Sequence, residues 1–312
     1  MILGFDIGGT KCAVVTATSE NGEINIVDKK TIPTDLFISP KAMIEKLIDI
    51  ADKMVENQEV SSIGISCGGP LSSKLGIIMS PPNLVGWDDV HIVDIMKEHF
   101  EVPVHLQNDA NACAVAEWKF GAGKGTNNMI FLTFGTGLGA GLILDGKLYS
   151  GTNDNAGEVG HIRLEDDGPV GYGKRGSFEG FCSGSGIAQL GKMFAEKAKK
   201  NGVTPSYANG EITAKTIAEA ANQGDSTAIE VYKTCGTKLG KGLSVLIDVL
   251  NPERIVIGSV FTRSRDLLWK YTKMVIDKES LSLSANVCEV VPASLEEQIG
   301  DYAAIGVALL ED

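Results

Sequence analysis

Short β-branched runs of alternating apolar and polar residues predict strands in the first part of the chain, and stretches with helical apolar spacing lie between them. The predicted strands here are residues 2–7, 12–17, 24–32, 62–66 and 102–106. The predicted helices are residues 40–56, 89–100 and 110–120. An opening meander followed by βα units indicates an α/β domain.

A second strand, glycine turn and strand begins about 130 residues after the first, which predicts a duplicated domain. The predicted strands in this part are residues 129–134, 140–144, 147–149, 254–259 and 288–291. The predicted helices begin at 183 and span 226–250 and 295–310. Gly236, Gly240 and Gly242 lie inside the longest helix and predict close packing against it.

Asn108 and Asp109 come directly after the strand at 102–106 and before the helix at 110–120. Open α/β sheets place their chemistry at the carboxyl ends of strands, so Asp109 is a candidate catalytic carboxylate. The simpler alternative is that Asn108 or Asp109 only caps the following helix. The glycine turns and the acidic and histidine residues elsewhere in the chain favour the catalytic interpretation.

Two glycine turns, residues 8–11 and 135–139, contain exposed backbone N–H groups and threonine hydroxyls suited to binding phosphate. A Gly-Gly hairpin turn is equally common as plain structure. Neither turn has the spacing of a P-loop or of a dinucleotide-binding motif. If both turns bind phosphate, they hold one nucleotide between two domains.

Composition narrows the class of protein. A formal net charge of −12 argues against a protein that binds the phosphate backbone of nucleic acids. The six cysteines include no Cys-x-x-Cys pair, which predicts reduced thiols and a cytoplasmic protein rather than a disulfide frame or a zinc site. The first residues do not resemble a signal peptide, and no apolar run approaches the roughly 20 residues of a membrane span.

Glu158, His161 and Glu179 form a second polar group in a region rich in glycine. Taken alone, a loop histidine or glutamate is more often a surface or capping residue. The turn-rich loop at 66–87 adds Gly69 and Asn83, which either line a site or lie in a plain connection.

These motifs together resemble the ROK family of bacterial sugar kinases and regulators, within the actin-like superfamily. The likeness covers nearly the whole chain and rests on residues 6–11, 108–111, 135–139, 157–161 and 251–253. It implies an α/β, actin-like (ribonuclease H-like), duplicated two-domain sugar kinase fold, with ATP and sugar in the interdomain cleft. The expected domains are residues 1–122 with the C-terminal helix at 295–312, and residues 123–294.

The resemblance also assigns roles to individual residues. The residues implied to bind ATP and Mg²⁺ are Asp6, Gly8, Gly9, Thr10, Lys11, Gly135, Thr136, Gly137, Gly139 and, beside the adenosine, Gly258. The residues implied to bind the sugar are Gly69, Asn83, Asn108, Asp109, Glu158, His161 and Glu179, with Asp109 as general base. The resemblance further implies a homodimer.

Two departures from the family pattern stand out. Relatives often carry three cysteines after the histidine that bind structural zinc with it, whereas the corresponding positions here are Val170, Tyr172 and Ser177. We therefore expect no zinc, and a loop ordered by its glycine turns and by apolar packing of Val170, Tyr172 and Phe178. The second departure is Ser259, where relatives usually have glycine.

The sequence therefore predicts an ATP-dependent hexose kinase acting on a glucose-like sugar or an N-acetylhexosamine, at its 6-hydroxyl. The alternative is a non-catalytic, sugar-sensing regulator of the same family. A DNA-binding head is not expected, because the acidic chain begins at the first predicted strand. The identity of the hexose is left open, and loops 66–87 and 150–156 are the expected places for discriminating contacts.

Overall fold

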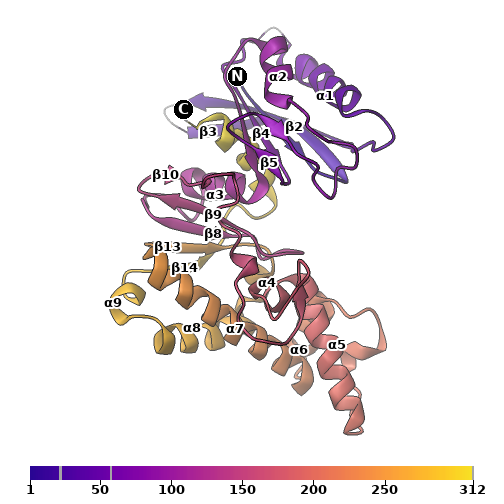
Figure 1. Cartoon of the computed structure of the whole chain (residues 1–312), viewed down its shortest axis with the longest axis vertical. Coiled ribbons are helices and arrows are strands. Elements are labelled where there is room, and N and C mark those ends of the chain that lie inside the picture. Colours follow the sequence, from indigo (N-terminus) through magenta and orange to yellow (C-terminus); the bar gives the residue numbers. More distant parts are fainter. Residues whose placement is uncertain (21–22, 57, 311–312) are drawn as a thin grey trace. The chain divides into compact units, whose positions relative to one another are not determined.

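The computed structural model describes residues 1–20, 23–56 and 58–310 (Figure 1). The chain divides into two compact units, each of which we describe separately. Unit 1 consists of Met1–Lys124, Leu148–Ala156 and Leu295–Asp312. Unit 2 consists of Gly125–Lys147 and Gly157–Ser294. No helix among the described residues is long and apolar enough to cross a membrane.

Unit 1 is built on a five-stranded mixed sheet of order β3-β2-β1-β4-β7. The strands are β1 (Ile2–Ile7), β2 (Lys11–Glu20), β3 (Glu23–Pro33), β4 (Ser62–Cys67) and β7 (Val104–Asn108). The first three strands are antiparallel, and β4 and β7 continue the sheet in parallel with β1. A small hairpin of β5 (Leu71–Ser72) and β6 (Ile77–Ile78) follows β4.

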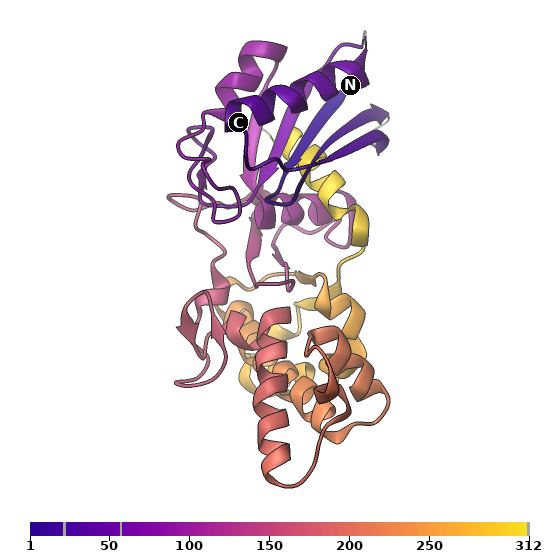
Figure 2. The same ribbon diagram turned by 90° about the vertical axis from the view of Figure 1, so that its right-hand side faces the viewer.

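Helices cover both faces of this sheet, as Figure 2 shows for α1 and for the C-terminal helix in yellow. The helices of unit 1 are α1 (Pro40–Val55), α2 (Ile92–Phe100), α3 (Asp109–Phe120) and α10 (Ile299–Ala308), with a 3-10 turn at Glu296–Gln298. The apolar sides of α1 and α2 bury Met43, Leu47 and Met96 against the strands. On the opposite face, a Cβ at Gly64 would lie 2.0 Å from the carbonyl oxygen of Ala304, so glycine permits the close approach of α10.

Unit 2 contains a second mixed sheet of order β10-β9-β8-β13-β14. Its strands are β8 (Met129–Leu132), β9 (Ala140–Leu144), β10 (Lys147–Leu148), β13 (Arg254–Ile257) and β14 (Glu289–Pro292). An antiparallel β8–β9 pair continued by the parallel strands β13 and β14 repeats the arrangement of β1, β2, β4 and β7. The sheets therefore confirm the duplicated α/β fold that the repeated pattern predicted.

Helices make up most of the rest of unit 2. They are α4 (Phe178–Phe181), α5 (Gly184–Lys200), α6 (Ala214–Asn222), α7 (Ser226–Leu250), α8 (Val260–Glu279) and α9 (Ser282–Ala285), with 3-10 turns at Val159–His161 and Ser206–Asn209. A short hairpin joins β11 (Val170–Gly171) and β12 (Lys174–Arg175). The predicted close packing of α7 is confirmed, because a Cβ at Gly236 or Gly240 would lie within 2.7 Å of carbonyl oxygens of α8.

The structure differs from the sequence-based expectation in its helices and in one domain boundary. Helices α4, α6, α8 and α9 have no predicted counterpart, and the expected C-terminal helix begins at Ile299 rather than at 295. The segment Leu148–Ala156 lies with unit 1, although the expected boundaries placed it in the second domain. Its contacts explain this, because Asp154 accepts hydrogen bonds from the backbone N–H and the hydroxyl of Ser73.

Candidate functional site

The first glycine turn, residues 8–11, joins β1 to β2 and is closed by a 3.1 Å hydrogen bond from Gly8 N–H to the carbonyl oxygen of Lys11. The loop containing Asn83 packs directly on this turn. A Cβ at Gly9 would lie 2.3 Å from the carbonyl oxygen of Asn83, so only glycine fits. The turn and the Asn83 loop are thus one structural group, although more than 70 residues separate them in the chain.

Asn108 and Asp109 lie at the carboxyl end of β7, as the sequence predicted. The Asn108 side-chain oxygen accepts a 2.8 Å hydrogen bond from Asn111 N–H and caps α3. Its amide nitrogen reaches the carbonyl oxygen of Asp154 at 3.5 Å. Asn108 therefore does cap the following helix, which was the simpler alternative. Capping uses its side-chain oxygen and not its amide nitrogen. Asp109 Oδ1 accepts a 2.8 Å hydrogen bond from Ala110 N–H.

The charged forms of the Asp6 and Asp109 carboxylates are disfavoured by their surroundings in unit 1. Burial, followed by the charges of Asp109 and Asp301, raises the pKa of Asp6 to about 6 from an ordinary value of 3.8. Desolvation by the surrounding protein also raises the pKa of Asp109. Part of the Asp109 side chain is exposed, and the water there limits the size of that rise. Raised carboxyl pKa values are typical of functional sites.

Asp301 is a member of this group that sequence patterns did not identify. It lies in the first turn of α10 and pairs with Lys29 of β3 at 2.5 Å. The adjacent Gly300 lies against Asp6, since a Cβ there would be 3.3 Å from Asp6 Oδ2. Only the packing of the C-terminal helix against β1 brings Asp301 to Asp6, and no local spacing contains that information.

The second glycine turn, residues 135–139, joins β8 to β9 in unit 2. Gly135 N–H donates to the carbonyl oxygen of Gly137 at 2.9 Å, and Gly139 N–H donates to the hydroxyl of Thr133 at 3.0 Å. Glu179 Oε2 accepts a 2.9 Å hydrogen bond from Leu138 N–H. The structure therefore brings Glu179, a predicted sugar ligand, onto the predicted phosphate turn. The hydroxyl-bearing Thr136 is exposed.

Glu158 and His161 lie at the 3-10 turn Val159–His161, and both side chains are exposed. The His161 ring packs edge-on against Tyr172, with ring centroids 5.4 Å apart. Gly160 packs against the second glycine turn, because a Cβ there would lie 2.3 Å from the carbonyl oxygen of Leu138. Glu179 and the 3-10 turn that carries Glu158 and His161 thus lie on the same part of unit 2.

The remaining candidates occupy the ends of parallel strands. Gly258 follows β13, and the next residue, Ser259, has a positive φ of 53°. Val260 N–H then donates a 3.0 Å hydrogen bond to the carbonyl oxygen of Phe134, next to the second turn. The serine at this departure from the family pattern therefore still lies beside the second turn. Gly69 follows β4, and no atom lies within 4 Å of a Cβ built there, so its backbone is open.

One expectation about the loop before Glu179 is wrong. Phe178 is fully buried, as expected, but Val170 is 38% exposed and Tyr172 is 77% exposed. The short β11–β12 hairpin turns these two side chains outward, so apolar packing by them does not order the loop. Within the described residues, no group of three or more His, Cys, Asp or Glu side chains is arranged to hold a metal ion. The expected absence of zinc stays a prediction.

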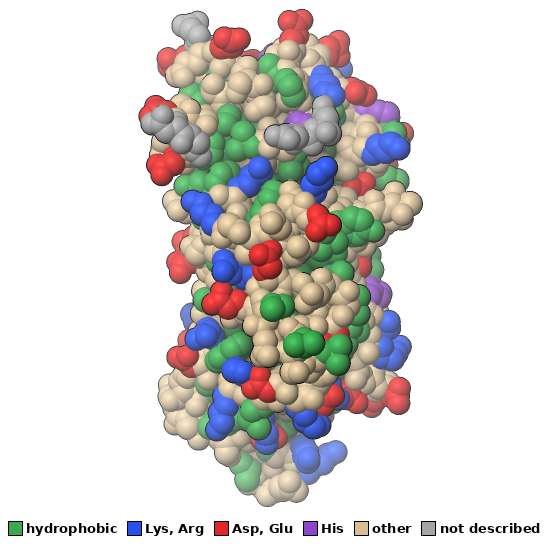
Figure 3. All heavy atoms as spheres, turned by 90° about the vertical axis from the view of Figure 1, so that its left-hand side faces the viewer, with side chains coloured by type: hydrophobic (Ala, Val, Ile, Leu, Met, Phe, Trp, Pro, Cys, Tyr) green, Lys and Arg blue, Asp and Glu red, His purple; other side chains and the backbone are tan. Residues whose placement is uncertain are grey.

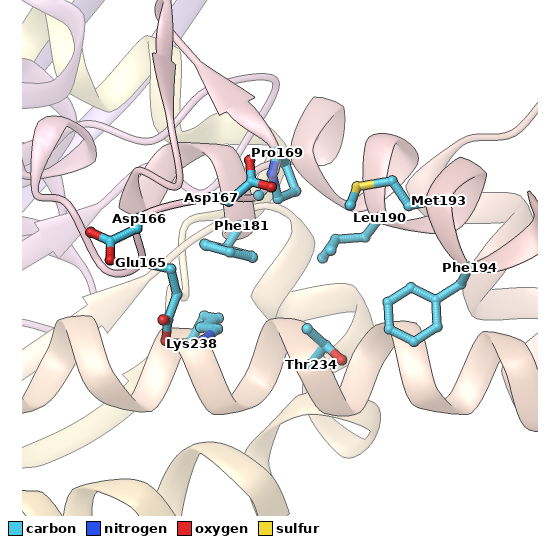
Figure 4. A pocket seen from close by; sticks show the side chains of 11 residues that line it. Glu165, Asp166, Asp167, Pro169, Phe181, Leu190, Met193, Phe194, Thr234 and Lys238 are labelled. Carbon is cyan, nitrogen blue, oxygen red and sulfur yellow. Dashed lines mark hydrogen bonds and ion pairs between the residues drawn. The ribbon is translucent and has the colours of Figure 1, made fainter. Parts of the chain in front are cut away.

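An open hollow of about 480 Å³ lies elsewhere in unit 2 (Figure 4). Its lining includes Glu165, Phe181, Leu190 and Lys238, and contains none of the predicted site residues. On the face of the molecule in Figure 3, acidic and basic side chains are interspersed, and no basic patch forms there.

Two sheets of matching strand order, each with a glycine turn between its antiparallel strands, define a duplicated, actin-like α/β protein. The chain belongs to the ROK family, whose model matches residues 2–311.

Several relatives support this placement. A glucokinase of Halalkalibacterium halodurans is 34% identical over 308 residues, covering 96% of this chain and 92% of that protein. A xylose repressor of Caldicellulosiruptor bescii is 32% identical over 290 residues, covering 89% of this chain and 70% of the repressor. The crystal structure of a ROK family glucokinase from Streptomyces griseus, in complex with glucose and AMPPNP, matches with a TM-score of 0.72 at 27% identity, covering 98% of this chain and 97% of that one.

Proposed function

We propose that this protein transfers the γ-phosphate of ATP to a hydroxyl of a hexose, the 6-hydroxyl of a glucose-like sugar or an N-acetylhexosamine. The observation that carries the proposal is Asp109, a carboxylate with a raised pKa at the carboxyl end of β7, beside the polar Asn108. A general base works best when its pKa approaches the working pH. The relatives named as glucokinases support the same activity.

Asp109 would accept the proton of the attacking hydroxyl. Phosphoryl transfer otherwise depends on positioning and on neutralising charge. The hydroxyls of Thr10 and Thr136 and the Lys11 ammonium would hold the phosphates. The backbone N–H groups of the turns would contribute too, apart from those of Gly8, Gly135, Leu138 and Gly139, which already bond within the protein. Mg²⁺ would neutralise the phosphate charge, and Asp6 fits it, because a nearby cation would offset the burial and repulsion that raise its pKa. Gly258 would lie by the adenosine.

Hydrogen-bond donors and acceptors on several side chains would bind the sugar hydroxyls. Asn83 and Asn108 would contribute amides from unit 1, with the open backbone of Gly69 beside them. Glu158, His161 and Glu179 would contribute from unit 2. The proposal requires both units to act on one sugar and one nucleotide. Closure around them would exclude water and limit ATP hydrolysis.

A second candidate is a non-catalytic, sugar-sensing protein, which the similarity to a xylose repressor supports. A sensor needs the sugar ligands but neither a base nor phosphate turns. Asp109 and both turns are all present in this chain, which favours the kinase. We further propose a homodimer, as the family resemblance implies, and the cytoplasm as its location, where the six free cysteines stay reduced.

An assay of ADP release over a panel of hexoses tests the proposal. The panel contains glucose, fructose, allose, mannose, N-acetylglucosamine and N-acetylmannosamine, each with excess MgATP. We expect sugar-dependent ADP release with at least one hexose, and a phosphorylated sugar in equal amount. Sugar binding by calorimetry with no ADP release for any member would favour the sensor instead.

A further inference from the structure

The loop between the two predicted sugar ligands His161 and Glu179, residues 162–178, has little apolar packing of its own before the buried Phe178 at its end. Val170 and Tyr172 face outward, and the loop contains only the two-residue strands β11 and β12. A loop that places two ligand side chains must nevertheless hold them within a fraction of an ångström. Its contacts with the helices of unit 2 supply the order.

Glu165 joins the loop to the long helix α7. Its Oε1 accepts hydrogen bonds from Lys238 Nζ and, at 2.7 Å, from Lys241 Nζ. Lys238 and Lys241 are three residues apart and therefore project from the same side of α7. The hydrogen bond from Lys238, more than any other contact, lowers the pKa of Glu165 to about 2, so the carboxylate stays charged at any working pH.

Lys238 also contacts the helix that carries Glu179. Its Nζ lies 5.1 Å from the centre of the Phe181 ring, and Phe181 belongs to α4 (Phe178–Phe181) with Glu179. Only 15% of the Lys238 side chain is exposed. Figure 4 shows Lys238 rising from α7 between Glu165 and Phe181. One ammonium group thus contacts both the loop and the helix of a predicted sugar ligand.

Further contacts complete the attachment. Gly168 of the loop packs on the Phe181 ring, since a Cβ there would lie 2.5 Å from it. Gln189 of α5 forms two hydrogen bonds of 2.9 Å with the backbone of Val170, one donated and one accepted. At the other end of the loop, Lys174 Nζ donates to the carbonyl oxygen of His161 at 2.5 Å. The loop is therefore fixed at both ligand-bearing ends.

We propose that Lys238, together with Glu165 and Lys241, is a positioning cluster that holds the 162–178 loop and α4 in the arrangement that binds the hexose. This inference rests on the proposed function, because it takes His161 and Glu179 as sugar ligands. None of the three residues is among the predicted sugar ligands. Their removal acts through the loop, so it weakens sugar binding most. The second turn keeps the hydrogen bonds of Gly135 and Gly139, and only its Leu138 N–H bond to Glu179 depends on α4.

The test compares Lys238→Met, which keeps the stem and removes the charge, with Lys238→Arg, which keeps the charge. Lys233→Met is the matched control, because Lys233 lies on the same helix and its ion pair among the described residues is with Glu230, at 3.0 Å. We expect Lys238→Met to raise KM for the hexose about fivefold with kcat within about twofold. Lys238→Arg should restore KM, and Lys233→Met should leave it unchanged.

Hydrogen exchange provides a second measurement that needs no turnover. Peptides covering 162–181 should exchange faster in Lys238→Met than in wild type or Lys233→Met, while peptides of β8 and β13 should not change. Unchanged exchange and unchanged KM in Lys238→Met overturn the proposal. A uniform rise in exchange over unit 2 that Lys238→Arg does not reverse also overturns it, because it shows a general role in stability. A wild-type chain that phosphorylates no hexose would refute the proposed function, and the exchange data would still decide whether Lys238 holds the loop.

Discussion

The two glycine turns occupy the same place in two sheets of the same strand order, yet their surroundings differ. The turn at 8–11 follows Asp6, whose charge is disfavoured by burial and by Asp109 and Asp301. The turn at 135–139 follows the buried Phe134, and its backbone donates hydrogen bonds to Thr133 and Glu179. Duplication has thus preserved the architecture while the polar chemistry has diverged.

This difference suggests that unit 1 contributes mainly to the chemical step and unit 2 mainly to binding. In unit 1, burial disfavours the charged forms of Asp6 and Asp109, and a nearby cation or a bound proton would offset this. Stored unfavourable charge of this kind is typical of a reacting centre. In unit 2, the N–H groups of Gly135, Leu138 and Gly139 bond within the protein and fix the shape of the turn, which is typical of a prearranged binding surface. Changes in unit 1 should therefore affect turnover most, and changes in unit 2 should affect binding most.

The largest expected effect is on turnover in Asp109→Asn. The amide keeps the size of the side chain but cannot accept the proton, so kcat should fall by about 10² or more. KM for the sugar should change less. Steady-state kinetics with the preferred hexose measure both constants. Glu179→Gln in unit 2 is the comparison, and it should mainly raise KM. Near-normal turnover in Asp109→Asn would sink the assignment of the base.

The next effect is on ATP affinity in Thr136→Val. Loss of a hydroxyl that binds a charged phosphate should weaken ATP binding about tenfold. Thr136 is exposed, so the change should not disturb packing. Calorimetry of ATP and of the sugar separates the two affinities. Sugar affinity lost with ATP affinity intact would reverse the placement of the nucleotide.

The corresponding substitution in the first turn, Gly9→Val, would not separate ATP binding from sugar binding as the sequence suggested. Gly9→Val was expected to weaken ATP binding selectively, by the same argument as Thr136→Val. The carbonyl oxygen of Asn83 lies where the new Cβ would be, so this substitution would displace a predicted sugar ligand as well. Thr10→Val, at an exposed hydroxyl, is the better partner for the comparison.

Much of the fold was predictable from the sequence because its information is local. Apolar periodicity located α1, α3 and α7 to within two residues at each end, and the repeated glycine turns predicted the duplication. The predicted positions of Asn108 and Asp109 at a strand end followed from the same local pattern.

Contacts between distant segments were not predictable. Asp301 reaches Asp6 only through the packing of α10, and Asp154 reaches Ser73 across 81 residues. The loop at 162–178 is the clearest case. Its sequence indicated apolar packing, whereas its charged partners Lys238 and Lys241 lie more than 70 residues later on α7. Ionic contacts at that distance leave no periodic pattern in the chain.

A smaller effect is expected on the stability of unit 1 in Asp6→Asn. The folded-state pKa of Asp6 lies above its ordinary value, so this group costs stability as pH rises from about 4 through about 6. The shift corresponds to at most about 3 kcal/mol, and partial exposure reduces the expected gain to about 1 kcal/mol. Urea unfolding of the ligand-free protein at pH 8 should show Asp6→Asn more stable than wild type by this amount, with the difference vanishing near pH 4. A variant that is less stable at both pH values would contradict the stored-charge interpretation, and Mg²⁺-dependent activity should fall in either case.

The smallest expected effect is that of removing zinc, which should change nothing. Three of the positions where relatives carry zinc ligands hold Val170, Tyr172 and Ser177, and the Ser177 hydroxyl already accepts a 3.0 Å hydrogen bond from Gly180 N–H as the cap of α4. A valine and a capping serine supply no thiolate, so tetrahedral coordination cannot be completed around His161. The order of unit 2 should come from its own contacts.

Elemental analysis of protein purified without chelator should therefore find no stoichiometric zinc. A zinc-selective chelator, added with Mg²⁺ in excess, should leave the rate of ADP release and the melting temperature unchanged. The variant to compare with the chelator experiment is Glu165→Gln, which removes the charge that pairs with Lys238 and Lys241. Suppose that variant loses sugar affinity while the chelator has no effect. Side-chain contacts then order the 162–178 loop, as expected if unit 2 is a prearranged binding surface. Stoichiometric zinc, or activity lost to the chelator, would mean that unit 2 is held by a metal and that this contrast is mistaken.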